Sequence, residues 1–372
     1  MKIVGVLTVV VLVTLGTVSM QGVVRANTDP FITIDDPGGA TFPNGINARG
    51  DIVGTYYDRA GRKHGFLRDA QYGTYLSIDD PNARVAKCRL ALPQDADFGT
   101  SAAAINQQGQ IVGQYNTRDG ECFFHTHTFL VHRDSLKFST IKYPIPNPES
   151  VSSDGHIDAN GINALGDIVG TCWFCHPYSP HGNCEYEGFL LHQGAYTAIE
   201  YPGSVTCDES KRLKNGVYGT EAYGLNGWGD IVGTYYYCPH STCTNRGFLL
   251  HHIGVAEIGS PQQHGAFTTI DDPNAGQIDQ RKKDAYEWGT YVRGINGFGA
   301  IVGYYVDKTG HDHGFLLKRG KYLTIDATHG VKGTRALGIN DQGDIVGDYT
   351  DVHGNTHGFL LRWQSVQAGL YK

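Results

Sequence analysis

Short apolar segments alternate with turn residues along the whole chain, and no stretch shows a long apolar period of 3.6 residues. Four segments recur in a fixed order: Gly-Ile-Asn, Ile-Val-Gly, Gly-Phe-Leu and Thr-Ile-Asp, or close variants of these. Short runs of β-branched and aromatic residues bounded by glycine and asparagine are typical of strands. The pattern therefore predicts an all-β protein in which one four-stranded unit repeats.

The Gly-Ile-Asn segment or a variant of it starts at residues 45, 104, 161, 224, 294 and 338. Each copy is followed by an Asn-x-x-Gly turn and then by Ile-Val-Gly, which predicts a tight hairpin. A short link also joins Gly-Phe-Leu to Thr-Ile-Asp, so each unit should be an antiparallel meander. The shortest spacing, from residue 294 to residue 338, is 44 residues. It matches the roughly 40–50 residues of a propeller blade.

The two ends of the repeat complement each other. The last unit has no Thr-Ile-Asp segment after Phe359, whereas an extra copy at residues 33–35 precedes the first unit. A ring explains both facts and hides the sheet edges. We therefore predict a six-bladed β-propeller of four-stranded antiparallel blades, with the N-terminal strand completing the last blade and Gly-Ile-Asn innermost. An open β-solenoid is the alternative, and it would leave residues 31–35 without a role.

The chain begins with the features of a secretory signal peptide. Lys2 precedes a predominantly apolar run over residues 3–15, and small residues lead to Val24-Arg25-Ala26. A retained anchor is the alternative, but the run is shorter than the roughly 20 residues that span a bilayer. We expect a signal peptide at 1–26, the propeller at 27–364 and a tail at 365–372. The mature protein should be a secreted monomer, extracellular or periplasmic, with no membrane span.

Composition narrows the function. The formal net charge is −7, which argues against a nucleic-acid partner because such proteins carry basic faces. The 50 glycines follow no collagen period and mark turns instead. Asp-Asp-Pro steps at 35–37, 79–81 and 271–273 have the chemistry of calcium ligands, but we favour a role in ending strands, with proline stopping the pairing. No other cofactor and no metal is expected.

Eight cysteines in an exported chain indicate disulfides. If Gly170 faces Phe189 across a hairpin, the same register places Cys175 opposite Cys184. The next unit likewise places Cys238 opposite Cys243. Opposed cysteines on neighbouring strands have the Cα spacing of about 5.5 Å that a disulfide needs. Four cysteines then remain; Cys88–Cys122 with Cys172–Cys207 is the arrangement we expect, but the sequence leaves their pairing open.

A zinc site is the alternative role for some of these cysteines. Cys172-x-x-Cys175-His176, followed by His181 and Cys184, has zinc-like spacing. We favour disulfides because the export signal and the hairpin register both support them.

Candidate site residues lie on the innermost strand. The positions three before each Gly-Ile-Asn segment are Phe42, Ser101, Asp158, Glu221, Tyr291 and Arg335, and the positions one before it are Asn44, Ala103, Asn160, Tyr223, Arg293 and Leu337. Both sets should surround the axial mouth on the face of the long inter-blade loops.

Two carboxylates near two arginines can shift pKa values or hold a polar ligand. The catalytic candidates are thus Asp158, Glu221, Arg293 and Arg335, with inter-blade ion pairing as the alternative that we favour. The binding candidates are Tyr223, Tyr291, Asn160 and Asn44.

The repeated Asn-x-x-Gly-x-Ile-Val-Gly-x-Tyr followed by His-Gly-Phe-Leu resembles the bacterial "probable extracellular repeat, HAF family". The resemblance covers residues 31–362 and includes triplets beginning at His64, His313 and His357, whereas Glu187 and Arg246 replace the histidine in two units. It implies export and a repeat fold, and it transfers no catalytic residue. The repeated histidines, His127 among them, should have a structural role.

The sequence has no G-x-S-x-G, H-E-x-x-H or Walker motif. It therefore favours a secreted binding or scaffold module, with a glycan or a cell-surface protein as partner. The alternative is an extracellular propeller enzyme, a polysaccharide or lactone hydrolase or lyase with its site at the axial mouth.

Overall fold

The computed structural model describes residues 29–35, 39–83, 98–118, 124–142, 156–175, 184–203, 215–239, 244–251, 267–276 and 288–364. Within these ranges strands are the dominant regular structure and are joined by turns and links, as the sequence pattern predicts. No helix in this part of the chain has the length and apolar character needed to cross a membrane.

The strands form consecutive four-stranded antiparallel units. Unit 1 is β2 (Thr41–Ile46), β3 (Ile52–Tyr57), β4 (Lys63–Arg68) and β5 (Tyr75–Ile78); unit 2 is β6 (Thr100–Ile105), β7 (Gln110–Arg118), β8 (Phe124–His132) and β9 (Ser139–Ile141); unit 3 is β10 (His156–Ile162), β11 (Ile168–Cys175), β12 (Cys184–His192) and β13 (Ala195–Ile199). Unit 4 is β14 (Asn215–Leu225), β15 (Ile231–Pro239), β16 (Thr244–Leu250) and β17 (Phe267–Ile270); unit 5 is β18 (Gly289–Ile295), β19 (Ile301–Val306), β20 (Asp312–Lys318) and β21 (Lys321–Ile325); unit 6 is β22 (Gly333–Ile339), β23 (Ile345–Thr350) and β24 (Thr356–Leu361) with β1 (Phe31–Ile34).

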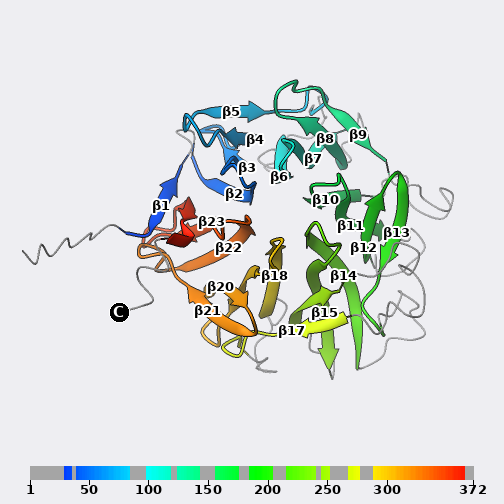
Figure 1. Ribbon diagram of the computed structural model, residues 1–372, viewed down its shortest axis with the longest axis vertical. Helices are drawn as coiled ribbons and strands as arrows, with labels where there is room; N and C mark the ends of the chain where they lie inside the picture. The colour runs from blue at the N-terminus through cyan, green and yellow to red at the C-terminus, as the bar shows by residue number, and fades with distance from the viewer. Residues whose placement is uncertain are drawn as a thin grey trace, which may run out of the picture.

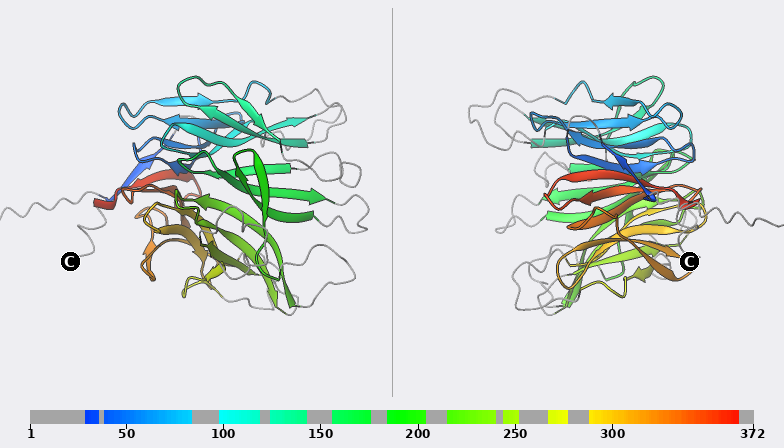
Figure 2. Two further views of the ribbon diagram at one scale, coloured as in Figure 1. Left: turned by 45° about the vertical axis from the view of Figure 1, so that its right-hand side comes forward. Right: turned by 90° about the vertical axis from the view of Figure 1, so that its left-hand side faces the viewer.

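The units are arranged around a common axis, so the fold is a β-propeller (Figure 1). Within each unit, strands that follow one another along the chain pair side by side. The Gly-Ile-Asn strands lie nearest the axis and the Thr-Ile-Asp strands on the outside; the inner strands are β2, β6, β10, β14, β18 and β22. Seen from the side, the strands run roughly along the axis between the two faces of a thick disc (Figure 2).

The N-terminal strand completes the last unit. β1 pairs antiparallel with β24, with Thr33 opposite Phe359 and Ile34 opposite Gly358. This is the pairing that the extra Thr-Ile-Asp segment predicts. It joins the two ends of the repeat and covers the outer edge of β24.

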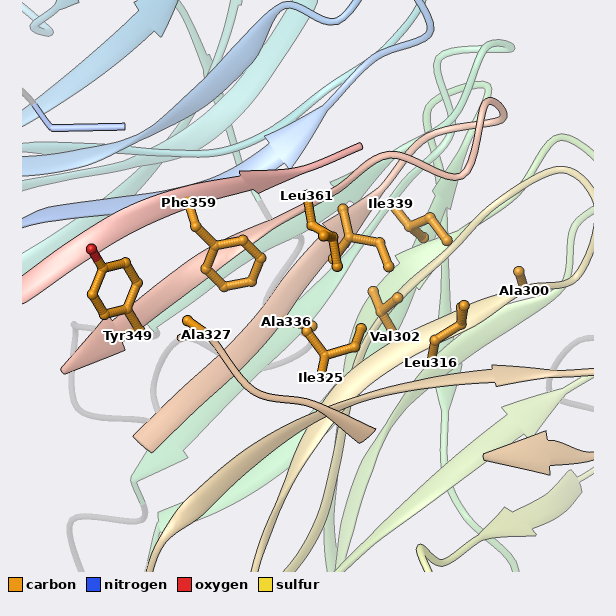
Figure 3. Close-up of a cluster of buried hydrophobic side chains, with 11 residues drawn as sticks. Ala300, Val302, Leu316, Ile325, Ala327, Ala336, Ile339, Tyr349, Phe359 and Leu361 are labelled. Carbon is orange, nitrogen blue, oxygen red and sulfur yellow. The ribbon is translucent and has the colours of Figure 1, made fainter. Parts of the chain in front are cut away.

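The core consists of similar clusters between neighbouring units. One cluster combines Val302 and Ile325 of unit 5 with Ala336, Tyr349 and Phe359 of unit 6 (Figure 3). Another continues the packing across the closure and joins unit 6 to unit 1; its buried members are Ile34, Ile46, Ile52, Phe66, Val346 and Leu360. Each sheet thus buries both of its faces against neighbours, which stabilises the ring through apolar burial.

The phenylalanine of Gly-Phe-Leu is fully buried in every unit and explains the glycine of Ile-Val-Gly. A Cβ atom on Gly54 would lie 2.7 Å from the Phe66 ring and would also overlap the backbone of β2. The aromatic ring therefore needs a neighbouring position without a side chain, and the repeat keeps the two residues together.

The asparagines of the Asn-x-x-Gly turns form a closed cycle of hydrogen bonds around the axis. Each Nδ2 donates to the backbone carbonyl of the asparagine in the next unit, at 2.9–3.4 Å, in the order Asn47, Asn106, Asn163, Asn226, Asn296, Asn340 and back to Asn47. The side-chain oxygen accepts the backbone N–H four residues later, for example that of Asp51. One residue type therefore shapes its own turn and fastens the adjacent unit.

The repeated histidine joins three strands of its unit. His357 Nδ1 lies 2.8 Å from Asp35 Oδ2, its Nε2 lies 3.4 Å from Asp351 Oδ2, and its ring stacks on Tyr349. Because Asp35 follows β1 and Asp351 follows β23, the imidazole connects the N-terminal strand to the last hairpin. The same arrangement recurs as His64 with Asp79 and Asp58, and as His313 with Asp326 and Asp307.

Candidate functional site

A cavity of about 470 Å³ opens on the axis at the face opposite the Asn-x-x-Gly turns. Its walls come from the inner strands, from the strands beside them and from Lys63, the first residue of β4: Phe42, Asn44, Thr55, Tyr57, Lys63, Ser101, Ala103, Gln114, Asn160, Tyr223, Arg293, Tyr304, Arg335, Leu337 and Asp348. All six positions one before Gly-Ile-Asn lie in this lining, as do Phe42, Ser101 and Arg335 from the positions three before it.

A β-bulge directs the nearer set of side chains toward the axis. In every unit the register of the two inner strands shifts across the residue before Gly-Ile-Asn, as between Pro43 and Gly45 or between Val292 and Gly294. A bulge leaves one residue without a cross-strand partner and re-aims its side chain. The bulge therefore places Asn44, Tyr223 and Arg293 in the cavity lining.

The farther set faces the residue that follows Ile-Val-Gly on the second strand. The cross-strand partners are Phe42–Thr55, Ser101–Gln114, Asp158–Thr171, Glu221–Thr234, Tyr291–Tyr304 and Arg335–Asp348. Asp348 and Tyr304 were not among the sequence candidates. The residue that follows Ile-Val-Gly was the signal that could have found them. Among these six residues only Asp348 is an aspartate, and it lies opposite Arg335, which is the only arginine among the positions three before Gly-Ile-Asn.

Arg335 and Asp348 form an ion pair in the cavity wall. Arg335 Nε and Nη2 both donate to Asp348 Oδ1, at 2.9 and 2.7 Å, and the Asp348 side chain is only 2% exposed. Burial raises the pKa of Asp348, and the charge and hydrogen bonds of Arg335 oppose that rise. Asp348 Oδ2 is buried and has no hydrogen-bond partner in the described part of the chain. Arg335 is thus already neutralised by the protein.

Arg293 is held by aromatic rings instead. Its guanidinium carbon lies 3.9 Å from the centre of the Tyr223 ring and 5.6 Å from that of Tyr304, and Nη2 donates to the Tyr304 hydroxyl at 3.3 Å. The Tyr223 hydroxyl in turn donates to Glu221 Oε2 at 2.9 Å. Tyr291 stacks on Tyr304, with ring centres 4.6 Å apart and planes within 8°. Units 4 and 5 therefore share one aromatic cluster around a cation.

Asp158 and Glu221 are close enough to influence each other. Burial raises the pKa of Asp158 to about 6; the charge of Glu221 adds to the rise and that of Lys63 opposes it. Burial also raises the pKa of Glu221, against the charge of Arg293 and the hydrogen bond from Tyr223. Neither carboxylate is among the residues of the cavity wall given above. The predicted tetrad is thus divided: Arg293 and Arg335 line the cavity, whereas the two acids do not.

The predicted binding residues differ in what they do. Asn44 Nδ2 donates to the Ala102 carbonyl at 2.9 Å and Asn160 Nδ2 to the Ala222 carbonyl at 3.0 Å, so both asparagines fasten neighbouring units. Tyr223 faces the cavity. The Tyr291 hydroxyl accepts a hydrogen bond from Asn245 at 2.6 Å, and Tyr291 is not in the lining.

The cysteine predictions fall partly outside the described residues. The register places Cys175 opposite Cys184, as expected from the hairpin, and Cys172 is buried. Cys238 is the second-to-last residue of β15 and lies opposite Gly216 of β14. The other four cysteines, Cys88, Cys122, Cys207 and Cys243, lie outside the described residues, as do His176 and His181. The four disulfides stay predictions.

Metal binding also stays open to experiment. Within the described ranges, no group of three or more histidine, cysteine, aspartate or glutamate side chains is arranged to hold a metal ion. Residues 36–38, which contain most of the first Asp-Asp-Pro step, lie outside those ranges. Calcium binding there is untested.

Comparison with known proteins finds neither a matching family model nor a matching curated protein. Among solved structures, a single-substitution mutant of the Aleuria aurantia lectin in complex with Fucα1-6GlcNAc shares 12% identity, with a TM-score of 0.44 over 87% of this chain and 93% of that one. The β-propeller domain of the Trilobed protease from Pyrococcus furiosus shares 10%, with a TM-score of 0.39 over 87% and 95%. A polysaccharide lyase of family PL25, an ulvan lyase, shares 10%, with 0.41 over 86% and 82%. The likeness concerns the general fold, and we carry no site over from these proteins.

Proposed function

We propose that the protein is an exported six-bladed β-propeller that binds a polar ligand of the sugar type in its axial cavity and does not transform it. The closed cycle of asparagines, counted as one turn from each blade, supports six blades. The apolar N-terminal segment and the resemblance to HAF-type extracellular repeats support export. We further propose that the secreted protein is monomeric.

The character of the axial cavity is the observation that carries this proposal. Its volume of about 470 Å³ lies within the range of roughly 300–1,000 Å³ that is usual for small-molecule sites. Tyrosine rings and a small number of fixed polar groups line it, a combination that covers the apolar faces of a sugar ring and orients its hydroxyl groups. Arg293 and the tyrosines are held by one another before any ligand arrives, which reduces the ordering cost of binding.

Binding rather than catalysis is favoured by the state of the charged groups. A general acid or base must reach its substrate within hydrogen-bond distance, directly or through one water. Asp158 and Glu221 stand outside the cavity lining, Glu221 is engaged by the Tyr223 hydroxyl, and Arg335 is engaged by Asp348. The charged groups are thus engaged in interactions within the protein, which favours a structural role in the cavity wall over acid–base catalysis.

A glycan array probed with the secreted full-length protein tests the proposal. We expect defined oligosaccharides to bind wild type, and Tyr57→Ala to weaken that binding at least about tenfold because Tyr57 lines the cavity. Tyr72→Ala is the matched control: Tyr72 is 72% exposed in the β4–β5 turn and does not line the cavity. Absence of any sugar binding, or equal losses in both variants, would count against the proposal.

An enzyme is the second candidate, because Asp158 with its raised pKa lies near Glu221, a carboxyl pair of the kind that performs acid–base chemistry. The reaction would be hydrolysis or elimination on a polysaccharide or lactone. Turnover on a panel of such substrates that disappears in Glu221→Gln, with ligand binding retained, would replace the binding proposal with this one.

A further inference from the structure

The cavity wall carries a charge opposite to that of the chain. The whole protein has a net charge of −7, yet its axial lining contains Lys63, Arg293 and Arg335 and a single carboxylate, Asp348. Since Asp348 is already paired with Arg335, the cation of the wall for which the described residues supply no ion pair is Arg293, whose charge also acts on Glu221 outside the lining. An anionic group is therefore favoured inside this cavity, although the chain as a whole has a negative net charge.

Arg293 is the cation with unused hydrogen-bonding capacity. A guanidinium group has five N–H donors, and the hydrogen bond found for this one is the bond of Nη2 to the Tyr304 hydroxyl at 3.3 Å. Its Nε is buried without a hydrogen-bond partner, and no carboxylate of the described residues lies within ion-pair distance of it. Arg335 differs, because two of its nitrogens are satisfied by Asp348.

Leaving a buried cation without a hydrogen-bonded counter-ion is costly, so such a group usually has an acceptor in the functional state. The planar fork of arginine matches a carboxylate, which can accept two parallel hydrogen bonds. The stacked Tyr223 ring fixes the plane of the Arg293 guanidinium. The direction from which an anion approaches is thereby restricted.

We propose that the axial cavity selects acidic sugars, and that Arg293 binds the uronic-acid carboxylate of the ligand. This inference rests on the proposed sugar-binding function and adds the class of sugar to it.

The groups around Asp158 add a pH dependence. The charged side chains that act on it are Glu221 from β14 and Lys63 from β4. Burial raises the pKa of Asp158 to about 6, so acidification from pH 7.5 to pH 5 removes a negative charge that lies outside the cavity lining, near Glu221 and Lys63. A sugar carboxylate stays ionised over that range because its pKa is near that of an α-carboxyl, about 3.5. Acidic sugars should therefore bind more tightly at pH 5 than at pH 7.5.

The test compares each uronic-acid trisaccharide of a small panel with its carboxyl-methylated counterpart, which has the same backbone and no charge. Titration calorimetry of the full-length protein should show at least about tenfold tighter binding of the acid, and this preference should weaken in 0.5 M NaCl and strengthen at pH 5. Arg293→Gln should lower the affinity for the acid about 10- to 100-fold and remove the preference. Arg319→Gln, which removes an exposed arginine at the β20–β21 turn, should leave the preference unchanged.

The possible outcomes separate the two proposals. Equal binding of acid and ester, or a preference that survives in Arg293→Gln, overturns the acidic-sugar inference and leaves sugar binding intact. Binding of sodium sulfate as tightly as the trisaccharides also overturns it, because the site would then recognise any anion. Binding of neither sugar form refutes both proposals. If Arg293→Gln does not fold, Arg293→Lys and the salt and pH dependence of wild type decide, since a neutral-sugar site would show neither dependence.

Discussion

Replacing Asn340 with alanine tests the closed ring most directly. Its Nδ2 donates to the Asn47 carbonyl at 3.1 Å across a sequence separation of 293 residues, and its Oδ1 accepts the Asp344 backbone N–H at 2.9 Å. The side chain is 3% exposed. Asn340→Ala therefore removes the last hydrogen bond of the cycle and leaves the Asp344 amide without its side-chain acceptor.

The expected cost follows from those two bonds. A net intramolecular hydrogen bond contributes about 1 kcal/mol, and a buried donor left unsatisfied costs about 1–3 kcal/mol. The Asn47 carbonyl keeps its hydrogen bond from the Gly50 backbone N–H, so only the Asp344 amide is orphaned. The free energy of unfolding should therefore fall by about 2–4 kcal/mol.

Urea denaturation followed by both far-ultraviolet circular dichroism and tryptophan fluorescence measures this cost, and coincident curves establish a two-state transition. Asn296→Ala is the matched control, because it removes an equivalent bond of 3.0 Å between units that are adjacent in sequence. In a closed ring both variants lose comparable stability. Because each variant also loses a turn hydrogen bond inside its own unit, the comparison isolates the inter-unit bond, which contributes about 1 kcal/mol. If Asn340→Ala costs about 1 kcal/mol less than Asn296→Ala, the Asn340–Asn47 bond is absent, the ends of the chain are not joined and the reasoning fails.

Three further outcomes are expected. Gly233→Ala should abolish folding, because a Cβ there would overlap the β14 backbone, whereas Gly227→Ala, which has open space around it, should be folded and within about 0.5 kcal/mol of wild type; soluble yield and thermal melting distinguish the two. Arg335→Ala should cost about 3–5 kcal/mol by leaving Asp348 charged and buried, and the double variant with Asp348→Ala should recover part of that loss in urea denaturation. Burial alone would lower the pKa of His357, but its two aspartate partners outweigh burial and raise it, so its stabilisation is complete below the unfolded pKa of about 6.5 and is lost as pH rises through the folded pKa. The stability difference between wild type and His357→Phe should accordingly shrink between about pH 6.5 and pH 8, by no more than about 1 kcal/mol, and a difference that is flat or grows with pH contradicts the assignment.

The repeat predicts the fold well because each of its residues is needed for a particular local backbone conformation or packing contact. Asn-x-x-Gly requires a tight turn, and the buried Phe66 requires the bare backbone of Gly54. The extra strand before the first unit and the missing one after the last then leave few arrangements other than a ring. The hydrogen-bond cycle of the asparagines was not predicted, since each partner belongs to the neighbouring unit and no local pattern reveals it.

The site is predictable only where two strands have a fixed register. The positions before Gly-Ile-Asn could be placed at the axis, and counting across the hairpin would also have found Asp348 opposite Arg335. That count would have corrected the hypothesis that Arg335 is available to a substrate. Lys63 could not be placed in this way, because it belongs to β4 and reaches the cavity from outside the two inner strands. Whether a carboxylate faces the cavity or stands outside its lining depends on side-chain packing, which the repeat does not encode.

Opposite walls of the cavity differ in chemistry because the units differ at the positions that line the axis. A ring of identical units would surround the axis with identical side chains and would suit a ligand of the same symmetry. Here Tyr223, Arg293, Tyr304 and Arg335 come from units 4, 5 and 6. The facing wall combines the rings of Phe42 and Tyr57 with the polar side chains of Asn44, Ser101, Gln114 and Lys63. A ligand that complements both walls must carry an anionic, stackable end and a neutral hydroxyl-rich end. An oligosaccharide with one acidic residue has this polarity, and a neutral homopolymer does not.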